Sequence, residues 1–174
     1  MDWYFTVFEL IDFRSFSNLW FWIMLAVFWS TASHFVMGIP YDMVTRINRG
    51  GARAEEAERD LEDLARINSN RLIYIGETAG FWLVGFGFFV LSALFSMGFF
   101  YNLEICQALF LLLTPMSIVV LLSLRWARMI QGKTGPELRK MLRRHRISIQ
   151  VIGMVSIFVT SIWGMHINMT AGVL

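Results

Sequence analysis

The stretch LIYIGETAGFWLVGFGFFVLSALFSMGFFY, residues 72–101, decides the fold, because its thirty residues carry a single charge, Glu77, near their start. Thirty helical residues cover about 45 Å, whereas the hydrocarbon core of a bilayer is about 30 Å thick. The stretch therefore predicts a transmembrane helix with one end that protrudes from the membrane. We expect this helix to be central in its bundle.

Small residues lie inside this helix, including Gly76 and Gly80 at a spacing of four and Gly85 further along. Small residues at such a spacing let another helix backbone approach closely. Glycine is also simply common in membrane helices. We interpret Gly76, Gly80 and Gly85 as a helix-packing face, with exposure to lipid as the alternative.

Three further stretches without Asp, Glu, Lys or Arg are long enough to cross a bilayer, at 18–39, 105–124 and 147–168. Pro40 disfavours helical geometry in the residue before it and ends the first stretch. Pro115 lies inside the second of them, where proline removes a backbone hydrogen bond and predicts a kinked helix. Together with residues 72–101, these stretches predict four transmembrane helices.

The segment 1–16 mixes aromatic and acidic residues, and its apolar residues recur at steps of three and four. This pattern predicts a short interfacial helix at the membrane surface, with an aromatic-anchored tail as the alternative. The chain is therefore predicted to be an all-α integral membrane protein with a single membrane domain over residues 1–174.

Basic residues are concentrated in two segments outside the predicted spans. The segment 41–71 holds six, and the segment 125–146 holds eight, of the fifteen Lys and Arg residues. Loops rich in Lys and Arg face the cytoplasm, so both segments are predicted to be cytoplasmic and both termini to face the opposite compartment. A cluster in the second segment would also attract anionic lipid headgroups. Its members are Arg139, Lys140, Arg143, Arg144 and Arg146.

Both basic segments carry a narrow apolar stripe at helical spacing. The stripes consist of Ala54, Ala57, Leu61 and Leu64 in the first segment and of Leu138, Met141, Leu142 and His145 in the second. Isolated helices of this length are marginal in water. We therefore expect the two segments to pack together as a helical cytoplasmic extension of the bundle, within one chain or across a subunit boundary. A solvated charged helix without a partner is the alternative.

Charges flank the first stripe. Glu55 with Arg59, and Glu62 with Arg66, are acid-before-base pairs at a spacing of four, which stabilise an exposed helix. We place Glu58 off the stripe.

Glu77 is the one acid that falls inside a predicted span, and ionisable groups at membrane depth are functional candidates by default. A span of about twenty residues that ends near Phe99 leaves Glu77 at the cytoplasmic headgroups. We interpret Glu77 as an interfacial acid paired with Arg71 or with a base of 125–146. A proton or ion pathway is the alternative.

No catalytic, cofactor-binding or metal site is expected. His34 and His166 fall near opposite ends of the predicted spans, so one metal or haem cannot bind both within a subunit, and His34 with His145 is the strained alternative. A single cysteine, Cys106, cannot hold a cluster by itself, and no serine or cysteine lies in a motif with a spaced histidine and acid. The net charge of +2 argues against nucleic acid as a partner.

The opening MDWYFTVFELIDFRSFSNLWFW, together with SHFVMGIPYDMVTR, resembles a family of small alphaproteobacterial membrane proteins that often carry the label "component of SufBCD complex". The resemblance implies a location in the bacterial inner membrane, which makes the compartment of both termini the periplasm. The label also implies iron–sulfur assembly. The sequence departs from that expectation, because it has one cysteine and no nucleotide-binding loop.

These observations favour a non-enzymatic accessory, assembly or scaffolding protein that packs against itself or against a larger inner-membrane complex. Its partners would be anionic lipids, further copies of the chain or other subunits. A small oligomeric channel or transporter-like protein is the first alternative. A membrane enzyme with an unrecognised site is the second.

Overall fold

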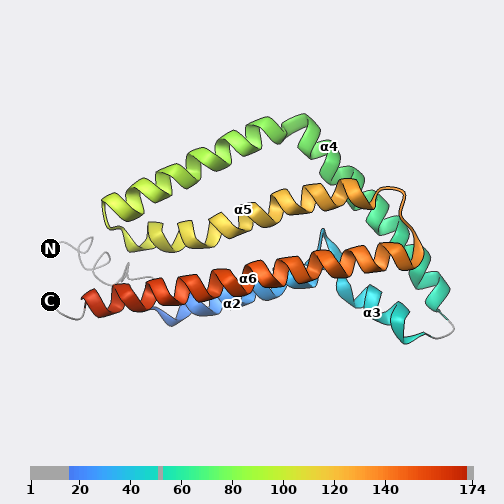
Figure 1. The fold of residues 1–174 in the computed structure, drawn as a ribbon, viewed down its shortest axis with the longest axis horizontal. Helices are drawn as coiled ribbons and strands as arrows, with labels where there is room; N and C mark the ends of the chain where they lie inside the picture. Colours follow the sequence, from blue (N-terminus) through green and yellow to red (C-terminus); the bar gives the residue numbers. More distant parts are fainter. Residues whose placement is uncertain (1–15, 51–52, 172–174) are drawn as a thin grey trace, which may run out of the picture.

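The computed structural model describes residues 16–50 and 53–171, so the predicted interfacial helix at 1–16 lies outside the described residues except for Phe16. The described chain is almost entirely helical (Figure 1). Its elements in order are α2 (Leu19–His34), β1 (Phe35–Val36), β2 (Ile39–Pro40), α3 (Tyr41–Arg49), α4 (Ala54–Phe95), the π-helical turn η1 (Ser96–Phe100), α5 (Glu104–Ile130) and α6 (Gly135–Ala171).

Among the described residues, three helices are long and apolar enough to cross a membrane: α4 continued by η1, α5, and α6. The prediction of a helical protein of membrane type is therefore confirmed at this level. The fourth predicted span is shorter than expected, because α2 has 16 residues. Its length of about 24 Å falls short of a hydrocarbon core of about 30 Å.

Helix α2 ends at His34 rather than at Ile39, which corrects the predicted boundary of the first span. The next six residues form a β-hairpin in which Val36 pairs with Ile39. Its two turn residues, Met37 and Gly38, have φ angles of 55° and 75°. Positive φ at both turn positions is the geometry that matches the twist of a two-residue hairpin, and glycine adopts it without strain.

Two helices continue from the basic segments straight into the membrane stretches. Helix α4 has 42 residues and α6 has 37, so each joins a predicted extension to a predicted span without a break. No proline or glycine interrupts the chain at either junction. Figure 1 shows that α4 nevertheless changes direction near its middle.

Helix α5, not α4, occupies the middle of the bundle. Helix α5 packs against both α4 and α6, and α2 lies along α6 (Figure 1). In the most apolar window of each helix, 6% of the residues are buried in α4, against 22% in α5 and 28% in α6. The expectation of a central α4 is therefore wrong. The physical reason is that its membrane half is apolar all round, so the pattern selects no face for burial.

The two apolar stripes meet in one hydrophobic cluster at the charged end of the bundle. Leu61 of α4 and Leu138 and Leu142 of α6 are each 1% exposed and belong to the same cluster. Val44 and Ile47, the apolar face of α3, are buried in it as well. The charged half of α4 therefore packs within the chain instead of standing alone in solvent.

At the opposite end, a buried amide fastens the α4–α5 hairpin to α6. The Gln107 side chain donates from Nε2 to the Gly98 carbonyl oxygen at 2.8 Å and accepts from Trp163 Nε1 at 2.9 Å. A Cβ atom on Gly98 would lie 2.9 Å from the Gln107 backbone nitrogen, so only glycine fits at this approach. Gln107 is 3% exposed, and its amide satisfies groups from two other elements.

Candidate functional site

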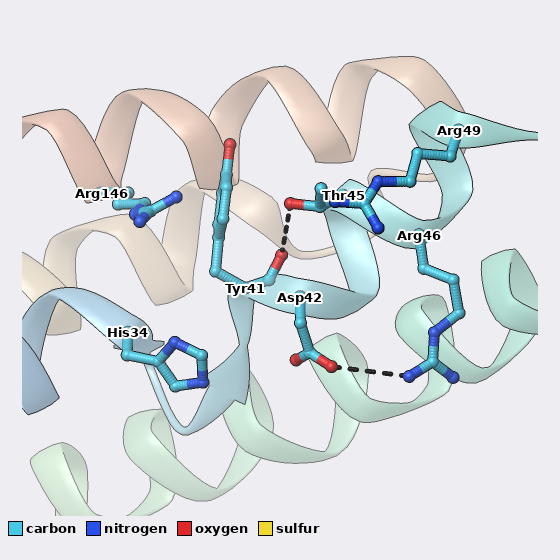
Figure 2. Close-up of a pocket in the computed structure, with 7 residues that line it drawn as sticks. All are labelled: His34, Tyr41, Asp42, Thr45, Arg46, Arg49 and Arg146. Atoms are coloured by element: carbon cyan, nitrogen blue, oxygen red, sulfur yellow. Dashed lines mark hydrogen bonds and ion pairs between the residues drawn. The ribbon is translucent and has the colours of Figure 1, made fainter.

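A basic pocket lies where the end of α2, the polar face of α3 and the middle of α6 meet (Figure 2). Its volume is about 360 Å³, within the range of about 300–1,000 Å³ that is usual for ligand sites. The lining residues are His34, Tyr41, Asp42, Thr45, Arg46, Arg49 and Arg146.

The β-hairpin places α3 at this position. It turns the chain at the end of α2, so that α3 begins beside the same pocket as His34, and the buried Val44 and Ile47 fix which face of α3 turns away from the core. Tyr41 and Thr45 follow each other at a spacing of four and are half-buried, Tyr41 packs against the hydrophobic cluster, and Thr45 Oγ1 donates to the Tyr41 carbonyl oxygen at 3.3 Å. The amphipathic pattern of α3 thus lines the pocket with its polar side.

Charges in the lining are predominantly positive: three arginines stand against one carboxylate. Arg46 pairs with Asp42 at 3.5 Å, and both side chains are more than half exposed. An exposed pair of this kind contributes at most about 1 kcal/mol. The lining therefore favours an anion over a cation.

Arg146 is the innermost base. Its guanidinium carbon lies 3.9 Å from the centre of the Tyr41 ring, a cation–π contact that is visible in Figure 2. Its Nε–H is buried and has no hydrogen-bond partner within residues 16–50 and 53–171. A buried donor without a partner costs about 1–3 kcal/mol.

The predicted headgroup cluster divides into two groups. Lys140, Arg143 and Arg144 are exposed, as a headgroup role requires. Arg139 instead forms an ion pair with Glu58, and Arg146 lies over Tyr41. Glu58 lies off the stripe, three residues before Leu61, and its carboxylate pairs with Arg139 of α6.

Glu62 also has a partner on α6 in place of the predicted Arg66. The Gly135 backbone nitrogen, the first of α6, donates to Glu62 Oε1 at 2.7 Å, and Arg66 pairs with Asp63 at 2.8 Å. A carboxylate at a helix N-terminus satisfies a free backbone donor and complements the helix dipole.

Two positions on the membrane helices, Glu77 and Pro115, keep their predicted roles as predictions. Glu77 is exposed on α4, and no ion pair joins it to Arg71 in the part of the chain that the structure describes. Its interfacial role stays a prediction. Helix α5 continues through Pro115 without ending, and a kink there also stays a prediction.

The three predicted packing glycines behave differently from one another. A Cβ atom on Gly76 would lie 3.2 Å from Leu124 Cδ2 of α5, so Gly76 accommodates a neighbour. At Gly80 and Gly85 nothing lies within 4 Å. Any packing role for these two residues requires a partner outside this chain.

Two glycines of α6 that the sequence analysis missed make room for aromatic side chains of α2 and of Phe16, which precedes it. A Cβ atom on Gly153 would lie 2.8 Å from Trp29, and one on Gly164 would lie 3.1 Å from Phe16 and 3.2 Å from Trp22. The signal was available, since a spacing of eleven residues is three helical turns and places both glycines on one face of α6.

His145 lies in the segment 125–146, outside the predicted spans, and is 1% exposed. Its Nε2 is 3.2 Å from Ser123 Oγ, and its ring stacks on Trp126 with centroids 5.6 Å apart. Burial lowers the pKa of the imidazole to about 4, so the ring is neutral at pH 7. Among the described residues, no group of three His, Cys, Asp or Glu side chains is placed to hold a metal ion.

No family model, curated protein or solved structure matches the chain.

Proposed function

We propose that the protein is a non-enzymatic accessory, assembly or scaffolding protein of a bacterial inner membrane. It packs through the membrane half of α4 against a helix of a second copy or of a larger membrane complex. The observation that carries this proposal is the isolation of α4 between its two ends.

Residues 81–86 are exposed at every position, so more than one full helical turn of α4 buries no side chain in the described chain. Phe81 is 84% exposed and Trp82 is 76% exposed. Lipid alone would tolerate these rings, since apolar side chains gain nothing by leaving lipid for another apolar surface.

The glycines distinguish this helix from an ordinary lipid-facing one. Gly80 and Gly87 are seven residues apart, which places them on one face, and no atom lies within 4 Å of a Cβ built at either position. Association in a membrane depends on close van der Waals packing, which bare backbone on one face permits. A second helix can therefore approach α4 closely at Gly80 and Gly87, where the described chain leaves the space open.

The proposed topology has four spans, with both termini in the periplasm and the two basic segments in the cytoplasm. The fourth span is α2 in a locally thinner layer, supported by its contacts with Gly153 and Gly164, both inside the predicted span of α6. The distribution of bases supports the orientation. Reporter fusions at the C-terminus test it, and a fusion active only in the cytoplasm overturns it.

A size series at one position tests the packing proposal. Gly80→Ala adds a methyl group and favours the helix, whereas Gly80→Ile adds bulk that blocks a close approach. Native purification followed by mass spectrometry should recover the partner or second copy with the parent and with Gly80→Ala, but not with Gly80→Ile. Recovery of the same complex with Gly80→Ile at parental abundance contradicts the proposal.

A further inference from the structure

We propose that the basic pocket formed by Arg46, Arg49 and Arg146 binds a phosphate group, supplied by an anionic lipid headgroup or by free phosphate. The proposal is independent of the α4 packing face, because none of these residues lies on α4. It rests on the charge of the lining, on a guanidinium held in it by the Tyr41 ring, and on its depth relative to the apolar parts of the helices.

The chemistry of the lining fits a phosphate oxygen. Arginine presents its donors in a planar fork that matches phosphate, and charge-assisted bonds of this kind are about twice as strong as neutral ones. Figure 2 shows Arg146 of α6 on one side of the Tyr41 ring and Arg49 of α3 on the other, with Arg46 directed towards Asp42. The single carboxylate, Asp42, is already engaged by Arg46, so the charge of Arg49 and Arg146 is not compensated within the lining.

Arg146 supplies a second observation. Its Nε–H is buried without a partner in the described residues, although Arg146 lines an open pocket. Contact with the Tyr41 ring holds the guanidinium in place. The Nε–H itself is closed to the pocket, so an anion there would bond the terminal N–H groups of the same guanidinium.

The depth of the pocket corresponds to the headgroup region. His34 is the last residue of the apolar helix α2, and Arg146 immediately precedes the uncharged stretch 147–168 of α6. Both elements therefore pass from apolar to polar sequence at the pocket. A lipid phosphate lies at the same boundary, because the headgroup region borders the hydrocarbon core.

The test uses the full chain in nanodiscs and in detergent, at high salt, where exposed charges are screened over about 3 Å. The Arg49→Gln/Arg146→Gln double variant removes two pocket bases. The matched control, Arg143→Gln/Arg144→Gln, removes two exposed bases from the same segment of α6. Arg49→Gln alone is the second pocket variant, since Arg49 is exposed on α3 and supports no core contact.

Binding of phosphatidylglycerol is measured by native mass spectrometry, with phosphatidylcholine as the lipid without net charge. We expect the double variant to bind phosphatidylglycerol at least about tenfold more weakly than the parent, Arg49→Gln to bind it several-fold more weakly, and the control to stay within about twofold. Equal losses in the control and pocket variants overturn the proposal.

Inorganic phosphate distinguishes the two sources. Retention of phosphatidylglycerol in the presence of millimolar phosphate assigns the pocket to a lipid headgroup, whereas saturable binding of phosphate with no preference for phosphatidylglycerol assigns it to the free ion. Binding of neither probe by the parent overturns the proposal.

Discussion

Leu61→Ala tests whether the charged ends of α4 and α6 pack together. Leu61 is 1% exposed and lies in the same cluster as Leu138 and Leu142. Truncation of a buried leucine to alanine costs about 2–5 kcal/mol, because the transfer free energy of the lost methyl groups and the cavity left behind add together. The loss falls on the contact between the charged ends of α4 and α6. We call this end the base of the bundle, and Leu61→Ala would open it.

Limited proteolysis of residues 41–71 in inside-out vesicles measures this opening. When opening is fast relative to cleavage, the cleavage rate follows the population of the open form, and about 1.4 kcal/mol changes that population tenfold. Leu61→Ala should therefore be cut at least about tenfold faster than the parent. Ile67→Ala, at a position on the same helix that is 56% exposed, is the control and should be cut at the parental rate. Equal rates for the parent and Leu61→Ala would refute the packed base.

Three further substitutions probe the other contacts. Gly153→Leu should separate α2 from α6 and lower the melting temperature in detergent by several degrees, because a Cβ atom added there would lie 2.8 Å from Trp29. Glu58→Gln should lower the melting temperature slightly, because it leaves the mostly covered Arg139 without its ion-pair partner, an effect of at most about 1 kcal/mol at this exposure. Gln107→Leu should cost about 1–3 kcal/mol, since it leaves the buried Gly98 carbonyl and the partly buried Trp163 N–H unsatisfied, and should raise hydrogen exchange at the α4–α5 hairpin.

Each of these has a matched control at an open position. Gly85→Leu adds the same side chain where nothing lies within 4 Å, Asp63→Asn breaks an ion pair of which both members are about two-thirds exposed, and Gln150→Leu replaces an exposed glutamine of α6. If a control matches its test variant in the same measurement, the corresponding contact does not stabilise the protein.

Sequence reasoning located the base of the bundle well, because charged residues surround a single apolar stripe there. Leu61 and Leu142 had one possible inward face, and both are buried. The membrane half of α4 offered no such contrast, since Phe81 and Phe89 are as apolar as any residue that faces the core. The neighbours of a uniformly apolar helix follow from packing and not from polarity, so the central position expected for α4 was wrong.

The site was less accessible to prediction for a related reason. Arg146 was recognised as one member of a basic run, but nothing local in the sequence connects it to Tyr41 or Arg49, about a hundred residues away. The connection depends on the hairpin at Met37 and Gly38, whereas Pro40 by itself predicts only the end of a helix. A short turn thus decided which distant residues share a pocket.

The two fastened ends of α4 have a consequence for recognition. Leu72 and Ile73 pack against the hydrophobic cluster at one end, and the Gly98 carbonyl oxygen accepts a hydrogen bond from Gln107 at the other. Residues 81–86 between them are exposed. A helix held at both ends is preorganised, because its conformation does not have to change on binding. A partner that docks on its middle therefore avoids most of the entropic cost of ordering it, so that modest contact area is enough for affinity. If α4 binds a partner as proposed, exchange of that partner would leave both attachments intact, without unfolding of the chain.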